Sequence, residues 1–441
     1  MFSRILIANR GEVAVRVIRA CKEMGIQTVA VFSQADSEAL HVSLADESLC
    51  IGPAQASRSY LNREAVLSAA LLSHAQAIHP GYGFLSEDPV FAALCEEKGL
   101  SFIGPSASSI RAMGDKDEAR RTMQAAGVPV IPGSSLLNDA KEALLWAKQI
   151  GYPILLKARS GGGGRGIRRI ESDEELLRAF PLASAEAQSA FGDGALYLEK
   201  YLFPVKHIEM QLIADKAGHV VCLGERECSM QLKNQKVLEE SPSLKVDEAT
   251  RARMEEVCVK AARAAQYEGL GTIEFLLDQN GGFYFMEMNT RLQVEHPVTE
   301  FVTGLDLVKW QIRVAAGQSL DFNQGDVRLS GHAIECRVNA LPGERGAGRV
   351  ELLHIPGGPA VRFDTALYQG YALSPFYDSM IGKLIVHAQT REEALRKMHA
   401  ALCELVIEGL EHNAESQIAL INEPEFLSGE YTTDFLQRRG K

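Results

Sequence analysis

The sequence predicts a mixed α/β protein with an open parallel α/β domain, a small lid carrying a glycine loop, and a C-terminal α+β domain built on an antiparallel sheet. Strand and helix patterns alternate near the N-terminus, a glycine run separates two strands, and an aromatic-rich hairpin follows. A chain of 441 residues also exceeds what one core supports. We expect an N-terminal domain over 1–114, a helical connector over 115–130, a lid over 131–203 and a C-terminal domain over 204–441.

The first 114 residues predict repeated strand–helix–strand units. A buried strand is expected over Ile5–Ala8, a helix over 12–24 and the next strand over 28–32. The alternation continues through 77–78 and 102–104, as in an open parallel sheet.

Two loops of this region differ in their functional content. The first turn, Asn9-Arg10-Gly11, has a single glycine and therefore lacks the dinucleotide-binding fingerprint. The segment HPGYGFLSED (79–88) is rich in Gly, Pro and polar residues. It either lines a cleft or forms a compact surface Ω-loop.

A glycine loop follows the connector. One helix is expected over 109–126, carrying Lys116, and a second over 139–150. The strand 154–157 ends in Lys157, and Gly161–Gly166 leads into a returning strand at 167–170. This is not a Walker A motif, since no Gly-Lys-Ser/Thr follows. It predicts a flap whose N–H groups cover phosphates, or simply a flexible hairpin.

The next strands carry many polar residues. Strands are expected over 197–202 and 207–214, the second half-buried because His207, Glu209 and Gln211 alternate with apolar residues. The run ERECSMQLKNQKVLEE (225–240) is charge-dense, which is typical of a solvated face, although it also concentrates candidate ligands.

The segment Gly271–Pro297 predicts a β-hairpin with Asn280-Gly281 as its two-residue turn. Counting from that turn places Glu274 opposite Glu287. It also places Phe275 opposite Met286, Leu276 opposite Phe285, and Leu277 opposite Tyr284. Both faces are apolar, so we expect the hairpin to be buried on both sides.

Two opposed buried carboxylates need a shared proton or a cation. An oxygen-only set of Glu274, Glu287 and Asn289 suits Mg²⁺. The alternative is a slipped register that leaves one glutamate at the surface.

Composition narrows the class of protein. The net charge of -11 disfavours a nucleic-acid surface. No signal peptide or membrane span is expected, and eight scattered cysteines without a C-x-x-C pair fit a reducing cytoplasm.

The parts together predict an ATP site. A phosphate flap, lysines from separate elements and an acidic metal site supply what phosphoryl transfer needs, and no kinase or hydrolase motif is present. Arg291 can bind a planar oxyanion, and Glu295 lies where a general base would act.

The order and wording of the motifs resemble the biotin carboxylases of the ATP-grasp superfamily. The resemblance covers nearly the whole chain and rests on IANRGE (7–12), HPGYGFLSE (79–87), MGDK (113–116), GGGGRG (161–166), EMNTRLQVEHPVTE (287–300) and YDSMIGKL (377–384). It implies an ATP-grasp fold whose lid covers ATP.

The resemblance also implies residue roles. ATP would be bound by residues of the lid, the connector and the sheet: Lys116, Lys157, Gly163, Gly164, Glu199, Lys200, Leu202, His207, Gln231 and Asn234. Mg²⁺ or Mn²⁺ would be held by Glu274, Glu287 and Asn289. Bicarbonate would be bound by Lys236, Arg291, Gln293 and Val294. Glu295 would deprotonate it, the resulting carboxyphosphate would release CO₂, and Arg337 would stabilise the biotin enolate that attacks CO₂.

Three positions depart from the family pattern. Asn234 replaces the usual histidine near the ribose and is expected to weaken nucleotide contact. Arg159 replaces a small residue before the flap, and the loop 341–348 is short and lacks an acidic-Pro segment.

The resemblance implies a cytoplasmic ligase that carboxylates biotin on a separate biotin carboxyl carrier protein, the first half-reaction of an acyl-CoA carboxylase. Acetyl-CoA is the expected acceptor, in fatty acid biosynthesis. Carboxyltransferase subunits and a homodimer are the implied partners. The alternatives are another ATP-grasp carboxylate–amine ligase, or a catalytically silent scaffold subunit.

Overall fold

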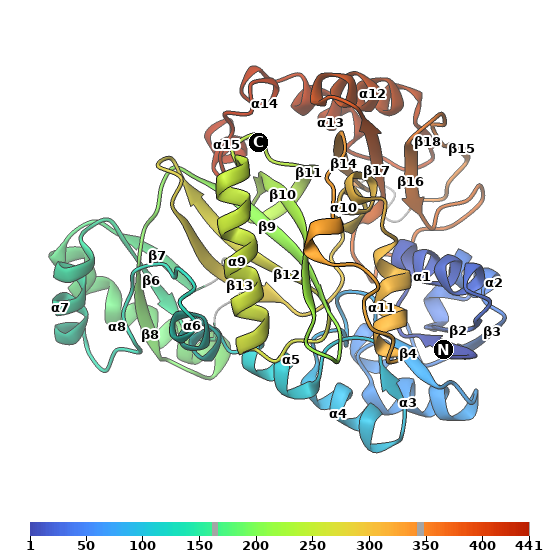
Figure 1. Ribbon diagram of the computed structural model, residues 1–441, viewed down its shortest axis with the longest axis horizontal. Coiled ribbons are helices and arrows are strands. Elements are labelled where there is room, and N and C mark those ends of the chain that lie inside the picture. Colours follow the sequence, from blue (N-terminus) through green and yellow to red (C-terminus); the bar gives the residue numbers. More distant parts are fainter. Residues whose placement is uncertain (161–165, 342–347, 441) are drawn as a thin grey trace.

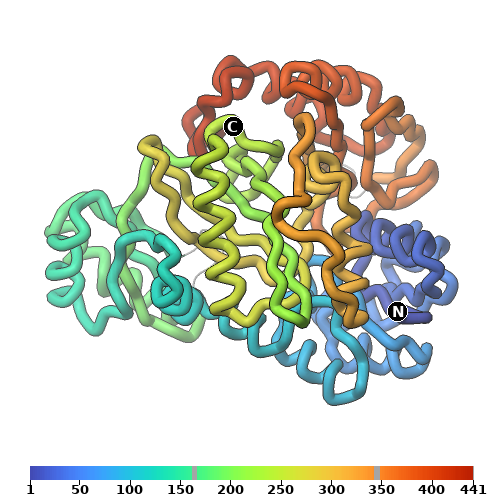
Figure 2. The backbone as a smooth tube through the Cα atoms, in the orientation of Figure 1, coloured from blue at the N-terminus to red at the C-terminus, as the bar shows by residue number. Residues whose placement is uncertain are grey.

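The computed structural model describes residues 1–160, 166–341 and 348–440. A long antiparallel sheet forms its centre, the lid projects from one side, and the N-terminal parallel sheet packs on the other (Figure 1). The C-terminal helices cover the top of the central sheet, and α15 (Phe435–Arg438) returns to β10 (Figure 2). Among the described residues, no helix combines the length and apolar character needed to cross a bilayer.

The N-terminal unit is a five-stranded parallel sheet with the order β3-β2-β1-β4-β5, which confirms the open α/β prediction. Its strands are β1 (Arg4–Ile7), β2 (Gln27–Phe32), β3 (Glu47–Cys50), β4 (Ala77–His79) and β5 (Ser101–Phe102). Its helices are α1 (Gly11–Glu23), α2 (Leu40–Leu44), α3 (Arg63–Leu72) and α4 (Pro89–Glu97).

The connector holds two helices, so the single helix expected over 109–126 was wrong. The chain forms α5 (Ala107–Gly114) and α6 (Lys116–Ala125). Asp115 lies between them in an extended conformation, and its carboxylate accepts hydrogen bonds from the N–H groups of Asp117 and Glu118, both at 3.0 Å. An aspartate that caps a new helix start competes with continuation of the old one. Lys116 therefore begins α6.

The lid is a three-stranded sheet with two helices and its own apolar core. It comprises β6 (Ile154–Ala158), β7 (Ile167–Ile170), β8 (Leu196–Lys200), α7 (Ala140–Ile150) and α8 (Asp173–Phe191). The glycines expected to cover phosphates, Gly163 and Gly164, lie outside the described residues. We propose the expected boundaries after 114, 130 and 203 as domain boundaries, supported by this separate lid core.

The central sheet has eight antiparallel strands in the order β13-β12-β9-β10-β11-β14-β17-β16. These are β9 (Val205–Ala214), β10 (Val220–Leu232), β11 (Gln235–Ser241), β12 (Gly269–Asp278), β13 (Phe283–Asn289), β14 (His332–Asn339), β16 (Val361–Thr365) and β17 (Met380–Ala388). Packed around it are α9 (Glu248–Ala264), α10 (His296–Thr303), α11 (Leu307–Ala315), α12 (Arg391–Glu404), α13 (Ala414–Ile421), α14 (Pro424–Leu427) and the pair β15 (Leu352–His354) and β18 (Val406–Glu408).

Two expectations about polar strands were wrong. All ten residues of β9 are buried, and within the charge-dense run residues 225–231 and 238–240 are buried in the hairpin of β10 and β11, whereas Lys233, Asn234 and Gln235 at its tip are exposed. The reason is Arg226, which is fully buried and donates to Glu209, Gln211 and three further side chains. A paired internal cation lets charged strands leave water.

The turn of the β10–β11 hairpin is Lys233-Asn234. Both residues have positive φ, 52° and 63°, and Leu232 pairs with Gln235. Two consecutive left-handed residues define a type I′ turn. Asparagine tolerates the left-handed conformation better than most residues, which explains why an asparagine suits position 234.

The β12–β13 hairpin does not use the expected two-residue turn. Only Gly281 of Asn280-Gly281 has positive φ, and the loop closes between Asp278 and Gly282. The Asp278 carboxylate accepts hydrogen bonds from the N–H groups of Asn280 (2.8 Å) and Gly282 (2.9 Å), which stabilises the longer loop.

The register confirms the pairing of Glu274 with Glu287 but corrects the pairs nearer the turn. The structure has Phe275 opposite Phe285, Leu276 opposite Tyr284 and Leu277 opposite Phe283, with a β-bulge next to Glu274. The observed loop is one residue longer than the expected turn, which shifts the pairs next to it. The bulge places one extra residue in β13 and so restores the pairing of Glu274 with Glu287.

Only one face of this hairpin is buried in the core, so burial on both sides was wrong. Phe275, Phe283 and Phe285 pack in an apolar cluster. Leu276 and Met286 on the other face are half-buried and line a cavity.

Lys233→Gly should raise the midpoint of thermal unfolding and Lys233→Val should lower it. The left-handed conformation costs a residue with a Cβ atom about 1 kcal/mol, and a β-branched side chain more. Lys216→Gly is the matched control, because Lys216 has no positive φ. Equal shifts for the Gly and Val variants would contradict the turn assignment.

Candidate active site

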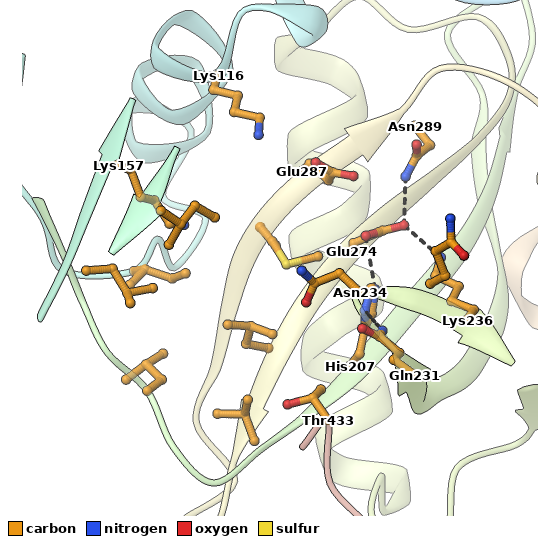
Figure 3. Close-up of a pocket in the computed structure, with 18 of the residues that line it drawn as sticks. Lys116, Lys157, His207, Gln231, Asn234, Lys236, Glu274, Glu287, Asn289 and Thr433 are labelled. Atoms are coloured by element: carbon orange, nitrogen blue, oxygen red, sulfur yellow. Dashed lines mark hydrogen bonds and ion pairs between the residues drawn. The ribbon is translucent and has the colours of Figure 1, made fainter. Parts of the chain in front are cut away.

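A cavity of about 970 Å³ lies between the lid, the central sheet and the C-terminal tail (Figure 3). Every site residue expected from the sequence and described in the structure lines it: Lys116, Lys157, Glu199, Lys200, Leu202, His207, Gln231, Asn234, Lys236, Glu274, Glu287, Asn289, Arg291, Gln293, Val294, Glu295 and Arg337. Residues far apart in the sequence therefore meet in one space.

The lid and connector supply cations on one side of the cavity. Lys157 of β6 forms an ion pair with Glu199 of β8. Lys116 begins α6 of the connector and extends toward the cavity from above Lys157 in the view of Figure 3. The Lys200 ammonium donates instead to the carbonyls of Gly151 (2.9 Å) and Tyr152 (3.2 Å), so it fastens the lid's own turn.

Lys236 of β11 compensates three buried carboxylates at the base of the cavity. Its Nζ lies 3.0 Å from Glu274 Oε1 and 2.8 Å from Glu295 Oε1, and it also pairs with Glu209. Burial alone would raise the pKa of Glu209, but Lys236 and other cations lower it to about 2. Burial likewise opposes ionisation of Glu274 and Glu295, yet Lys236 holds both pKa values below the ordinary range.

His207 is a second cation in this cluster. Its Nε2 lies 3.0 Å from Glu274 Oε2, and although burial lowers its pKa, Glu274 raises it to about 9. His207 Nδ1 lies 2.7 Å from the Gln231 amide nitrogen, so these two residues of the expected ATP-binding set are joined.

For Glu287 the nearby cations Lys116, His207 and Lys236 do not outweigh the opposing effects on its pKa. Burial raises its pKa, and the neighbouring charge of Glu274 raises it further. In the part of the chain that the structure describes, no hydrogen bond or ion pair is recorded for its carboxylate. A half-buried acid that lines a cavity beside a second acid fits a divalent cation. His207, Glu209 and Glu274 also approach one another closely enough to ligate an ion.

Arg337 forms an ion pair with Glu295 at the exit of β13, and Arg291 lies nearby. Arg337 Nη2 lies 3.0 Å from Glu295 Oε2, and Arg337 Nε donates to Glu239 at 2.7 Å. Arg291 donates to Asn289 Oδ1 (2.9 Å) and to Glu87 (2.8 Å). The ammonium group of Lys236 and the guanidinium group of Arg337 thus contact the ionised carboxylate of Glu295, and Arg291 adds positive charge nearby.

The segment 79–88 contacts residues of this site without lining the cavity. None of the described residues that line the cavity comes from this segment, so it is not a cleft wall. Its Glu87 instead holds Arg291 and accepts a hydrogen bond from Thr290 N–H at 3.1 Å.

Sequence reasoning missed two contributions. The first is Glu209, which was treated as part of a polar strand face. Its spacing of two residues from His207 places both side chains on one face of β9, and this was the available signal that Glu209 belongs to the site. Thr433, Asp434 and Gln437 of the C-terminal tail also line the cavity. Thr433 N–H donates to Val205 O at 3.1 Å, a contact across more than 200 residues that no local pattern reveals.

A lid facing an antiparallel sheet, with lysines on one wall and paired acids on the other, defines the ATP-grasp class of enzymes. The chain belongs to the biotin carboxylase family. Family models described as "Biotin carboxylase, N-terminal domain", "Carbamoyl-phosphate synthase L chain, ATP binding domain" and "Biotin carboxylase C-terminal domain" match residues 1–110, 115–323 and 335–438. The resemblance inferred from the motifs is confirmed.

Similar proteins cover the full chain. Biotin carboxylase 1 of Bacillus subtilis is 51% identical over 99% of this chain and 98% of its own length. The 2-oxoglutarate carboxylase small subunit of Hydrogenobacter thermophilus is 49% identical over 99% and 93%.

Solved structures agree. A biotin carboxylase–beta-gamma-ATP complex from Campylobacter jejuni is 48% identical, with a TM-score of 0.95 and 99% of both chains covered. The biotin carboxylase domain dimer of the Hydrogenobacter thermophilus 2-oxoglutarate carboxylase, with MgADP, ADP and bicarbonate, is 49% identical, with a TM-score of 0.93 over 100% of this chain and 98% of that one.

Lys236→Met should lower the free energy of unfolding by about 3–5 kcal/mol at neutral pH, because it removes a cation that pairs with three buried carboxylates and leaves them only partly compensated by Arg226, His207 and Arg337. Their folded-state pKa values would then rise above the unfolded values. The loss is therefore largest above those raised pKa values and shrinks as the pH falls and the acids take up protons.

Thermal unfolding of wild type and variant between pH 5 and pH 8 measures this gap. Lys236→Arg, which keeps the charge, is the control and should lose less. A gap that stays constant across the pH range would contradict the role given to Lys236.

Proposed function

We propose that the chain uses ATP and bicarbonate to carboxylate biotin carried by a separate protein. The observation that carries this proposal is the arrangement of Lys236, Arg291 and Arg337 around Glu295, in the same cavity as the lysines of the lid. The cavity thus has room for a nucleoside triphosphate on the lid side and for a small oxyanion beside Glu295.

The lid side suits the nucleotide. Lys116 and Lys157 supply point charges for phosphates, and Leu202 offers an apolar surface for a base beside Glu199 and Lys200. His207, Gln231 and Asn234 lie toward the sheet, where a ribose would fit (Figure 3). Thr433 adds a wall from the C-terminal tail.

Magnesium or manganese would be held by Glu274, Glu287 and Asn289. When bound, such an ion neutralises phosphate charge during transfer. The raised pKa of Glu287 supports this assignment, and Glu274 is already ionised by its cationic neighbours.

Bicarbonate would enter between Lys236 and Arg291, with Gln293 and Val294 beside it. Glu295 is ionised, because Lys236 and Arg337 outweigh the effect of burial on its pKa. It can therefore accept the bicarbonate proton while the bicarbonate oxygen attacks the γ-phosphate of ATP, yielding carboxyphosphate and ADP. Carboxyphosphate then breaks into CO₂ and phosphate.

Arg337 would act on biotin. Phosphate takes the N1 proton, the ureido oxygen gains negative charge, and the Arg337 guanidinium stabilises this enolate while N1 attacks CO₂. Gln417 and Asn413 hold the Arg337 carbonyl at 2.8 and 3.1 Å, so the backbone of this residue is fixed.

The departures from the family pattern bear on affinity. Arg159 lines the cavity, and its Nε lies 2.8 Å from Asp193 Oδ2 at the base of the glycine loop. It adds a cation on the phosphate side, whereas Asn234 offers the nucleotide a shorter group. Most of the short loop 341–348 lies outside the described residues.

We further propose that the chain works in the cytoplasm as a homodimer with a biotin carboxyl carrier protein and carboxyltransferase subunits. The dimer formed by the biotin carboxylase domain of the 2-oxoglutarate carboxylase supports the proposed homodimer. Cysteines that are all free support a reducing compartment. Relatives include a 2-oxoglutarate carboxylase and a pyruvate carboxylase, so the proposed acetyl-CoA acceptor needs its own test.

ADP release in the presence of bicarbonate, with and without free biotin, tests the function. Biotin should stimulate turnover, and carboxybiotin should form in step with ADP. An amine-dependent ADP release without biotin stimulation would favour another ATP-grasp ligase. No bicarbonate-dependent turnover at all would favour a scaffold.

Arg337→Ala should strongly reduce biotin carboxylation while bicarbonate-dependent ATP hydrolysis continues. The guanidinium is assigned to the enolate, whereas the attack of bicarbonate on ATP needs Glu295. Loss of one charged stabiliser predicts a fall of about 10²–10³ in the biotin step. Parallel assays of ADP and carboxybiotin measure the split.

Glu295→Gln is the contrasting variant and should lose both activities, because the amide cannot accept the bicarbonate proton. If Arg337→Ala and Glu295→Gln reduced both activities equally, the separate roles would be wrong.

A further inference from the structure

Glu335 of β14 is a fully buried carboxyl group that the proposed mechanism leaves unused. Its exposed fraction is 0%, and neither carboxyl oxygen has a hydrogen-bond partner among the described residues. An unpaired carboxylate is strongly disfavoured away from water, and such a group takes up a proton instead.

Glu335 lies directly opposite Glu239 of the neighbouring strand β11. Both side chains are fully buried, and two like charges in this position repel each other. Glu239, unlike Glu335, has a charged partner, because Arg337 Nε donates to its Oε1 at 2.7 Å. The arrangement favours one negative charge on the pair, placed on Glu239.

The surroundings leave Glu335 without a dedicated cation. The nearest lysine, Lys383 of β17, has its Nζ 2.5 Å from Val294 O and 3.4 Å from Glu12 Oε1 of α1. Burial raises the pKa of Glu335 well above its ordinary value, with Lys383 opposing and Glu239 reinforcing the shift. Burial also raises the pKa of Glu239, to about 7, against the effect of Arg337.

The charged and titratable groups facing the pair come from every element around it. They are Lys236 of β11, Arg337 and Cys336 of β14, Lys383 of β17, Cys228 of β10, Tyr82 of the segment 79–88, and Glu295 before α10. The cations in this set already serve Glu295, Glu239, Glu12 or the Val294 carbonyl.

We propose that Glu335 is held as a neutral carboxylic acid, so that the Glu239–Glu335 pair presents a single negative charge, which positions Arg337 beside Glu295. This inference rests on the proposed function, in which Arg337 acts on biotin. Glu239 and Glu335 are positioning residues, because they reach the substrate only through Arg337.

Glu335→Gln tests the proposal directly, since the amide has the shape of the protonated acid. Biotin carboxylation near neutral pH should stay within about twofold of wild type. Glu239→Gln should reduce it by about tenfold and partly recover as the pH rises, because removal of one acid lowers the pKa of the other, whose ionised form then faces Arg337.

The double variant Glu239→Gln/Glu335→Gln has no anion to offer from this pair. It should lose more than the two single effects combined, without recovery at higher pH, whereas bicarbonate-dependent ATP hydrolysis persists in all variants. Additive losses, or a folded Glu335→Gln enzyme without carboxylation, would overturn the proposal.

Infrared difference spectra of the protein alone separate this proposal from the function it rests on. At about pH 9, two units above the pKa of Glu239, wild type minus Glu335→Gln should show the C=O stretch of a protonated carboxyl group. Its absence would refute the neutral acid whatever the enzyme does.

Glu335→Met guards against a folding failure specific to the amide, since a neutral site tolerates an apolar side chain of similar size. If neither variant folded, Glu335 would be required in its ionised form, and the proposal would be wrong.

Discussion

The structure depends on one buried ammonium group, that of Lys236. Three carboxylates from β9, β12 and the start of α10 converge on it, and each would otherwise have to be protonated or solvated. Burying such a cluster is expensive, so the strands around it must hold it closely. Lys236 thereby couples the register of the central sheet to the chemistry of the cavity, because a slip of one residue would remove the cation from all three acids.

The sequence predicted the acidic pair of the cavity through a partly wrong path. The Asn280-Gly281 signal located the hairpin, but Asp278 stabilises a longer loop, and a β-bulge next to Glu274 restores the pairing with Glu287. Side-chain capping and bulges are set by a few specific contacts that counting does not include. The I′ turn itself occurs in the β10–β11 hairpin, at Lys233-Asn234, where the sequence showed only a charged run.

Burial of charge was the property that local patterns could not predict. The residues of β9 and β10 have the composition of a solvated face, yet Arg226 satisfies Glu209 and Gln211 of β9, Gln293 after β13 and Thr299 of α10, which come from three separate parts of the chain. By contrast, every described site residue that the resemblance named in advance lines the cavity. Motif residues are fixed by chemistry that repeats among related proteins, whereas the partners that neutralise them depend on the complete fold.

The same internal neutralisation explains how the cavity can accept anions. Without substrate, Lys236 and Arg337 are paired with Glu295, and Arg291 is paired with Glu87. Each of these three cations therefore has a carboxylate partner in the described structure. A small oxyanion that enters exchanges one carboxylate partner for another, and the cations need little further desolvation. In the proposed reaction Glu295 would then change role, because cations that turn toward the substrate leave it, and a carboxylate that loses its counter-charges becomes a stronger base. Binding of bicarbonate would thus raise the basicity of Glu295 at the moment when a proton has to be removed.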